Sequence, residues 1–273
     1  MAIITLTTDS GSKDYYTSAI KGAILQNRPQ AAIIDISHNI PKFDTEVASY
    51  VLKNSYKNFP VGSIHLIDVN TGSYDRTPYL VVYADEHYFI SADNGIFSLI
   101  LDQTNPDTIV ALEENERLKK SLFPARDVFA PAAAHLSEKK SILELGTANL
   151  SFKIKTNLTA FADANSIKGT VIYIDNYGNV ITNITKELFK KSYLNRKFGI
   201  QLKPSLKYSS EFGSFELEEI NRTYDDVSEG EVVAFFNSTG NLEIAINNGD
   251  ASGLLGLKNR EIIRVNFYDN ENS

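Results

Sequence analysis

Residues 2–24 read AIITLTTDSGSKDYYTSAIKGAI, and this stretch decides the fold that the sequence predicts. Residues 2–8 are apolar and rich in β-branched side chains, which is typical of a short buried strand. Residues 9–12 are turn formers, and from Asp14 onward small and apolar residues recur at helical spacing. A strand, a tight turn and a helix in this order predict an open α/β sheet with a ligand crevice at the carboxyl ends of its strands.

Asp9 lies in this turn and is the first candidate binding residue. Its carboxylate is suited to accept hydrogen bonds from a ribose diol. The alternative is that Asp9 or Ser12 only caps the following helix, which is a common use of both residue types. Because the turn lacks the G-x-G-x-x-G pattern, it identifies no dinucleotide by itself.

Strands and helices continue to alternate up to about residue 160. This alternation predicts an α/β N-terminal domain over residues 1–160, with a mostly parallel sheet and helices on both faces. The predicted strands after the first one cover residues 31–36, 63–68, 80–84 and 88–91, and the predicted helices cover residues 44–54 and 129–136, with a short helix ending at Leu101.

The pattern changes after about residue 161. From Gly169 onward, short segments with period-two alternation are separated by turns, which predicts strands of an antiparallel sheet. We therefore expect a smaller, all-β C-terminal domain over residues 168–273, joined to the first domain by a linker near residues 156–168.

The composition argues against several classes of function. The chain has 273 residues, of which 42% are apolar, so a folded core is expected. A net charge of −7 argues against binding to nucleic acid or to anionic membranes. The chain has no cysteine, and its four histidines lack metal-ligand spacing, so no metal is expected. With no apolar run of about 18 residues and no signal peptide, we expect a cytoplasmic protein.

Six blocks of sequence together resemble one known family. They read TLTTDSGSKDYYTSAIKG, SHNIPKFDTEVASYVL, ADNGIFSLIL, RDVFAPAAAHL, GTVIYIDNYGNVITNI and NSTGNLEIAINNGDAS, and they span nearly the whole chain. In order and spacing they are similar to the S-adenosyl-L-methionine (SAM) hydroxide adenosyltransferases, which share a fold with the fluorinating and chlorinating enzymes that use the same substrate. The resemblance implies a homotrimer that needs no cofactor, with SAM bound between the N-terminal domain of one subunit and the C-terminal domain of its neighbour.

The resemblance also implies roles for residues of the N-terminal domain. Asp9 matches the aspartate that holds the ribose hydroxyls. Phe43 matches an aromatic residue that packs near the sugar and the sulfonium.

In the C-terminal domain, the resemblance implies a site for the rest of the substrate. Asp175 and Asn179 match the pair that binds the methionine ammonium, and Ser238 matches the serine that binds its carboxylate. Tyr177 and Tyr224 match the rings on either side of adenine. The remaining match is Asn247, at the position that reads the adenine edge.

The sequence departs from the family at the catalytic residues. Hydrolytic members carry an Asp, Arg and His triad that prepares a water for in-line attack at C5′ of the ribose. The aspartate of their D-P-G-V-G block falls on Asn70, the arginine falls on Arg76, and the histidine of their F-H-G-R-D block falls on Pro124. Ser73 stands where halogenating members keep a hydroxyl, but Ala125 replaces a second serine contact, which argues against halogenation.

Three hypotheses follow from these residues. In the first, the protein hydrolyses SAM to adenosine and methionine with weakened catalysis, and Arg76, Asn70 and Ser73 position the water. In the second, it binds SAM or adenosine on the same scaffold without turnover, because Asn cannot accept a proton from water and Pro has no polar side chain. In the third, it is an α/β protein that binds another small molecule.

Overall fold

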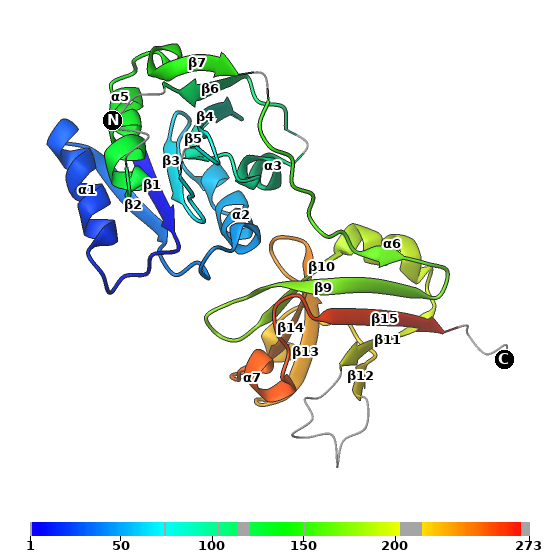
Figure 1. Cartoon of the computed structure of the whole chain (residues 1–273). Coiled ribbons are helices and arrows are strands. Elements are labelled where there is room, and N and C mark those ends of the chain that lie inside the picture. Colours follow the sequence, from blue (N-terminus) through cyan, green and yellow to red (C-terminus); the bar gives the residue numbers. More distant parts are fainter. Residues whose placement is uncertain are drawn as a thin grey trace. The chain divides into compact units, whose positions relative to one another are not determined.

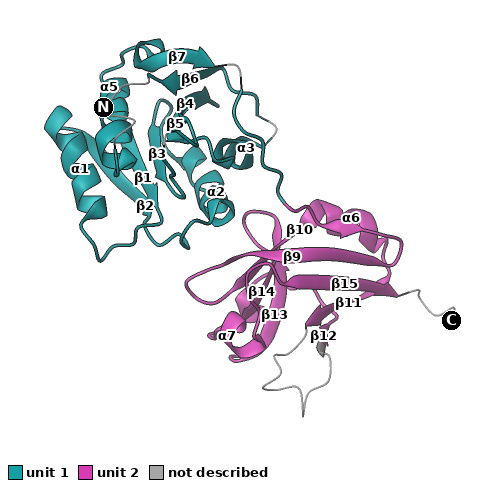
Figure 2. Ribbon diagram, in the orientation of Figure 1, with its two compact units in different colours: residues 1–157 teal, residues 158–273 magenta. Residues whose placement is uncertain are grey.

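The computed structural model describes residues 2–73, 75–102, 104–113, 121–149, 151–202 and 215–268 (Figure 1). The chain divides into two compact units, residues 1–157 and residues 158–273 (Figure 2). Each unit has its own hydrophobic core. In the described ranges, no helix is both long and apolar enough to span a membrane.

Unit 1 contains a seven-stranded sheet in the order β2-β1-β3-β5-β4-β6-β7. The four strands from β2 to β5 in this order are parallel neighbours, and the pairs from β5 through β4 and β6 to β7 are antiparallel. The bounds are β1 (Ile3–Thr8), β2 (Ala32–Ser37), β3 (Ile64–Asp68), β4 (Tyr79–Ala84), β5 (His87–Ala92), β6 (Thr108–Leu112) and β7 (Gly146–Asn149).

The sheet of unit 1 is therefore mixed, not mostly parallel as the sequence predicts. The physical reason lies between β4 and β5, where Asp85 and Glu86 form a two-residue turn with φ of 48° and 62°. Positive φ at both central residues is typical of the tight hairpin turn, and such a turn can only join antiparallel strands.

Helices pack on both faces of this sheet (Figure 1). Apolar side chains of α1 and α5 share one core cluster with Ile4 and Leu6 of β1, while α2 and α3 contact each other and lie on the other face. At the start of α2, the Asp44 carboxylate accepts hydrogen bonds from two backbone amides. The bounds are α1 (Tyr16–Asn27), α2 (Thr45–Lys53), α3 (Ile96–Leu101) and α5 (Ala130–Ser137), with shorter turns η1 (Tyr56–Asn58), η2 (Ala125–Phe129) and η3 (Ile142–Leu145).

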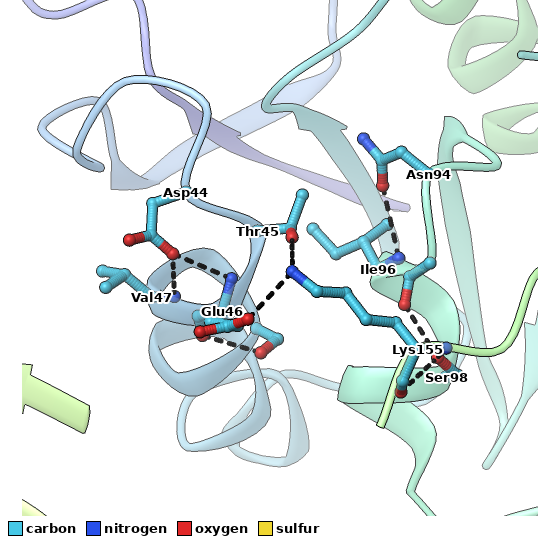
Figure 3. A network of polar contacts seen from close by, with 10 residues as sticks. Asp44, Thr45, Glu46, Val47, Asn94, Ile96, Ser98 and Lys155 are labelled. Atoms are coloured by element: carbon cyan, nitrogen blue, oxygen red, sulfur yellow. Dashed lines mark hydrogen bonds and ion pairs between the residues drawn. The ribbon is translucent and has the colours of Figure 1, made fainter. Parts of the chain in front are cut away.

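Lys155, near the end of unit 1, makes polar contacts with both α2 and α3 (Figure 3). The Nζ atom of Lys155 lies 3.0 Å from Glu46 Oε1 and 3.0 Å from Thr45 Oγ1, both at the start of α2. Its backbone exchanges two hydrogen bonds with the Ser98 hydroxyl on α3. The chain therefore leaves unit 1 from a defined position beside these two helices.

Unit 2 is built on an antiparallel sheet in the order β12-β11-β15-β9-β10-β14-β13, with β8 paired to β9. Its core includes Ile200, Ile244 and Val265. The strands are β8 (Phe161–Ala162), β9 (Ser166–Ile174), β10 (Val180–Thr185), β11 (Lys197–Leu202), β12 (Phe215–Leu217), β13 (Val232–Phe236), β14 (Asn241–Ile246) and β15 (Ile262–Tyr268).

Unit 2 is not all-β, because it also contains two helices, α6 (Lys186–Tyr193) and α7 (Ala251–Leu255), and the turn η4 (Tyr224–Asp226). Thr185 caps α6 by accepting a hydrogen bond from the Leu188 amide. Phe189 of α6 is buried in the core of the unit. The amphipathic spacing of KELFKKSY is typical of a helix. It was not predicted because the segments on either side have the alternating pattern of strands.

Candidate functional site

The candidate site of unit 1 lies at the carboxyl ends of its parallel strands. Because β1, β2 and β3 run in the same direction, the loops that follow them meet at one edge of the sheet. Asp9 follows β1, and its Oδ2 atom accepts hydrogen bonds from the backbone amides of Phe43 (2.8 Å) and Asn70 (3.2 Å). The structure thus brings together three of the residues that the sequence predicts for the site.

Asp9 does not cap the first helix. The residue before α1 is Tyr15, and no side chain makes a capping hydrogen bond there. The carboxylate is used instead to join two loops that are distant in the sequence. The capping interpretation of Asp9 is therefore wrong, and its Oδ1 atom has no hydrogen-bond partner within the described part of the chain.

The two loops held by Asp9 have unusual backbone conformations. Phe43 has φ of 65° and Asn70 has φ of 52°, in the left-handed region that costs a bulky residue most. The Asn94 side chain supports the second loop, since its Nδ2 donates to the carbonyls of Val69 (2.9 Å) and Asn70 (3.1 Å). The Phe43 side chain is 71% exposed, which leaves its ring open to contact a ligand.

Asp68 ends β3 and was not predicted as a site residue. Burial, with a smaller contribution from the charge of Asp9, raises its pKa to about 6, although the nearby Thr71 hydroxyl acts to lower it. Asp68 is the register partner of Thr8, so it lies beside the strand end that carries Asp9. Its position at the carboxyl end of a buried strand (SIHLID) is the sequence signal that could have identified it.

The other predicted catalytic residues lie on an exposed turn. The amides of Arg76 and Thr77 both donate to the Ser73 carbonyl at 3.1 Å. The Arg76 side chain is exposed and forms no ion pair with the described residues. Pro124 precedes η2 with φ of −56°, which suits proline at the start of a helical segment.

In unit 2, the predicted ammonium site is a hairpin turn between β9 and β10. The Asp175 Oδ1 atom accepts from the amides of Tyr177 and Asn179 at 2.9 Å each, and Oδ2 accepts from the Asn179 side chain at 3.0 Å. Gly178 completes the turn with φ of 83°. Tyr177 is 77% exposed, so its ring is free for stacking.

The hairpin continues into a polar network that includes a buried carboxylate. The Asn179 side chain lies 3.3 Å from the Tyr224 hydroxyl, which donates to Glu243 Oε1 at 2.7 Å. The side chain of Asn237 donates to the other Glu243 oxygen at 2.9 Å. Burial and the hydrogen bond to Glu243 raise the pKa of Tyr224, so its hydroxyl remains a donor. Glu243 was not predicted as a site residue, although it is a lone acidic residue within the apolar segment LEIAI.

Ser238 and Asn247 are not brought together within the chain. Ser238 is exposed in the turn before β14, whereas Asn247 follows that strand. The Asn247 side chain donates to the Val227 carbonyl at 2.9 Å, which fixes its orientation.

Two family models match the chain in the same order as its two units. The N-terminal domain of the SAM hydroxide adenosyltransferases matches residues 4–146, and their C-terminal domain matches residues 169–264. The chain belongs to the SAM hydroxide adenosyltransferase family. The family resemblance that the sequence motifs indicate is thereby confirmed.

Individual SAM hydroxide adenosyltransferase relatives align along nearly their whole length. The chain is 30% identical to the (R)-S-adenosyl-L-methionine hydrolase of Methanocaldococcus jannaschii, over 96% of this chain and 95% of the relative. It is 28% identical to the enzyme of the same name from Thermus thermophilus, over 94% and 97%. It is also 24% identical to a fluorinase of Nocardia brasiliensis, over 90% of each chain.

Two solved structures share the fold of this chain. An uncharacterized conserved protein from Thermotoga maritima superposes with a TM-score of 0.83 at 30% identity, covering 96% of this chain and 99% of that one. A conserved hypothetical protein from Thermus thermophilus superposes with a TM-score of 0.73 at 28% identity, covering 98% and 100%.

Proposed function

We propose that this protein hydrolyses SAM to adenosine and L-methionine. The observation that carries the proposal is the Asp9 carboxylate, which is held at the carboxyl edge of the sheet with one oxygen still available to a ligand. Family membership over both units supports the same conclusion, as do relatives named (R)-S-adenosyl-L-methionine hydrolase.

In this proposal, the two units bind different parts of SAM. Asp9 accepts hydrogen bonds from the ribose hydroxyls, and Phe43 packs near the sugar and the sulfonium. Asp175 and Asn179 bind the methionine ammonium, because a carboxylate with an adjacent amide suits a cation that carries several donors. Ser238 binds the methionine carboxylate.

We further propose that the adenine base stacks between Tyr177 and Tyr224, with Asn247 reading its edge. Ring faces suit a flat heteroaromatic base, and an amide offers both a donor and an acceptor. As proposed from sequence, each site would form between subunits of a homotrimer. The protein would be cytoplasmic, with SAM or adenosine as its partner, no nucleic acid and no cofactor.

For the chemical step, we propose that Asp68 is the general base, with Arg76, Asn70 and Ser73 positioning the water. A D-P-G-V-G register that begins at Asp68 puts Asn70 and Gly72 at its two glycine positions. The φ of 52° at Asn70 supports this register, because glycine adopts that conformation at least cost. In this register the family's aspartate falls on Asp68, so the site contains a carboxylate. The alignment that begins at Asn70 has none.

The reaction then balances without a metal or a second reactant. The water oxygen forms a bond to C5′ while the bond from C5′ to sulfur breaks. The electron pair of the breaking bond goes to sulfur, which turns the sulfonium into the neutral thioether of methionine. The proton of the water passes to Asp68, whose pKa of about 6 leaves it ionised at neutral pH.

The test is to incubate the purified protein separately with the two sulfonium epimers of SAM and to separate the products by chromatography. We expect adenosine and methionine in equal amounts, with the R epimer preferred as in the names of the relatives. Tight binding of SAM without product would favour the alternative of a silent binding protein. Failure to bind any adenosyl compound would reject both.

A further inference from the structure

Glu243 is a buried carboxylate in the middle of β14, and both of its oxygens are hydrogen-bonded to side chains of unit 2. The residue is 5% exposed. Oε1 accepts from the Tyr224 hydroxyl at 2.7 Å, and Oε2 accepts from the Asn237 side chain at 2.9 Å. Because a buried carboxylate is costly unless it is hydrogen-bonded, these two partners belong to the structure of the folded unit.

Neighbouring groups fix the direction of both hydrogen bonds to Glu243. Asn237 Oδ1 accepts from the backbone amides of Thr239 (3.0 Å) and Asn241 (3.2 Å). Since backbone amides can only donate, the Asn237 side chain must turn its Nδ2 toward Glu243. Burial and then the hydrogen bond to Glu243 raise the pKa of Tyr224, so its hydroxyl keeps the single proton that it donates. Both partners are therefore donors, as a carboxylate requires.

The two partners of Glu243 belong to different segments of the proposed site. Tyr224 lies in η4, and its ring packs edge-on against the buried Phe235 with ring centroids 4.7 Å apart. The ring is thus held at its hydroxyl and by Phe235, while 37% of the residue stays exposed. Asn237 follows β13 and begins the turn that contains Ser238. One carboxylate therefore joins the ring proposed for adenine to the turn proposed for the methionine carboxylate.

We propose that Glu243 is a positioning residue for substrate binding, which fixes the Tyr224 ring and the turn that carries Ser238 without touching SAM. The inference rests on the proposed function, because it takes Tyr224 and Ser238 as residues that bind SAM. It extends that function by assigning a role to a carboxylate inside the sheet. The effect of Glu243 on adenosine should then pass through the Tyr224 hydroxyl.

A double-mutant cycle on adenosine affinity, measured by isothermal titration calorimetry, tests this route. Glu243→Met has a side chain of similar length without an oxygen acceptor. We expect this variant and Tyr224→Phe each to weaken adenosine binding about 3- to 10-fold, as for one hydrogen bond. Because Tyr224→Phe already lacks the hydroxyl, adding Glu243→Met to it should change the affinity less than about 2-fold.

The contact of Glu243 with Asn237 is tested with S-adenosylhomocysteine, which carries the amino-acid group that adenosine lacks. In the Tyr224→Phe background, Glu243→Met should still weaken this ligand about 3- to 10-fold, because the turn with Ser238 loses its contact with the carboxylate. An unchanged affinity for S-adenosylhomocysteine would overturn the role at this turn.

Glu216 offers a matched control in the same unit. On β12, its Oε2 accepts from the Tyr268 hydroxyl at 2.6 Å, and its Oε1 lies 3.4 Å from the Asn266 side chain. These are the same kinds of partner, but none of them is proposed to bind SAM. Glu216→Met should therefore change the affinity for adenosine less than about 2-fold.

Three results would overturn the inference. They are an equal loss from Glu243→Met in both backgrounds, an unchanged adenosine affinity in Glu243→Met, and an equal loss in Glu216→Met. If wild type binds adenosine, each of them rejects this inference and leaves the proposed function standing. Wild type that binds no adenosine rejects both.

A second measurement needs no substitution of Glu243. NMR of tyrosine labelled with carbon-13 at Cζ, with the Tyr224 signal assigned from Tyr224→Phe, reports the ionisation of this hydroxyl. We expect Tyr224 to stay protonated at about pH 10, where exposed tyrosines ionise, because burial and Glu243 raise its pKa, with smaller contributions from Asp175 and Tyr177. Ionisation together with the exposed tyrosines would overturn the inference, even if Glu243→Met does not fold.

Discussion

The two carboxylate oxygens of Asp9 have different roles: one holds two loops, and the other is available to a ligand. Oδ2 accepts from the amides of Phe43 and Asn70, and both of these residues hold a positive φ. Such backbone conformations cost of order 1–3 kcal/mol each unless surrounding contacts support them. One acidic residue therefore orders two loops and still presents Oδ1 to a ligand.

Substitution of Asp9 should separate these two tasks. We expect Asp9→Ala to lower the affinity for adenosine by roughly 2–4 kcal/mol, because charge-assisted hydrogen bonds to the diol and the order of both loops are lost. Asp9→Asn retains an oxygen for the two amides and should lose less. Isothermal titration calorimetry measures both variants, and wild-type affinity in Asp9→Ala would show that the ligand binds elsewhere.

Asp68 should control the pH dependence of hydrolysis. A base with a pKa of about 6 is protonated and inactive below that pH, so we expect kcat/KM to rise with pH through about 6 and then level off. Asp68→Asn should lower kcat by about 10²–10⁴-fold and remove this limb of the profile. The rates are followed as adenosine release. A limb that persists in Asp68→Asn would assign it to another group.

At the scale of elements, β1, β3 and β5 contribute one residue each to a buried polar cluster, Thr5, His65 and His87, away from Asp9 along the strands. Thr5 Oγ1 lies 2.7 Å from His65 Nδ1, and His65 Nε2 lies 3.2 Å from His87 Nδ1. Tyr56 packs edge-on against both imidazole rings. Burial and, to a smaller extent, the charge of His87 together lower the pKa of His65 to about 3. The sheet thus contains an imidazole that stays neutral in the folded protein.

This buried imidazole should make the protein sensitive to acid. Below pH about 6.5 the unfolded chain binds a proton at His65 that the folded protein does not, so the free energy of unfolding falls as pH falls. The contribution is at most about 1.4 kcal/mol for each pH unit. Urea unfolding between about pH 7 and 5 measures the slope, and His65→Phe should flatten it. An unchanged slope in that variant would assign the acid sensitivity to other groups.

At the scale of the whole molecule, the residues proposed to bind SAM are divided between the two units. Asp9 and Phe43 belong to unit 1, while Asp175 and Asn179 belong to unit 2. Each unit has a separate core, so each half of the site is supported by its own sheet. In the proposed homotrimer, a complete site would combine halves from two chains.

Mixing two inactive variants tests this proposal. Asp9→Ala and Asp175→Ala should each abolish adenosine formation alone. Co-expression should give random mixed trimers. At about a quarter of their interfaces, a unit 1 that retains Asp9 should meet a unit 2 that retains Asp175 from the neighbouring chain, and these interfaces should be active. Light scattering should give about three times the 30.4 kDa chain mass. No regain in trimers that demonstrably contain both variants would place both halves of each site in one chain.

Local pattern by itself determined much of this protein. Periodicity and turn residues gave the strand, turn and helix at residues 2–24 and most helices of unit 1, because each depends on neighbours a few residues away. Ordered motifs identified the family. Tertiary structure alone decided the mixed sheet and the positions of Asp68 and Glu243. These features depend on hydrogen bonds between distant residues, such as Asp9 with Asn70 and Tyr224 with Glu243, which only folding brings within reach.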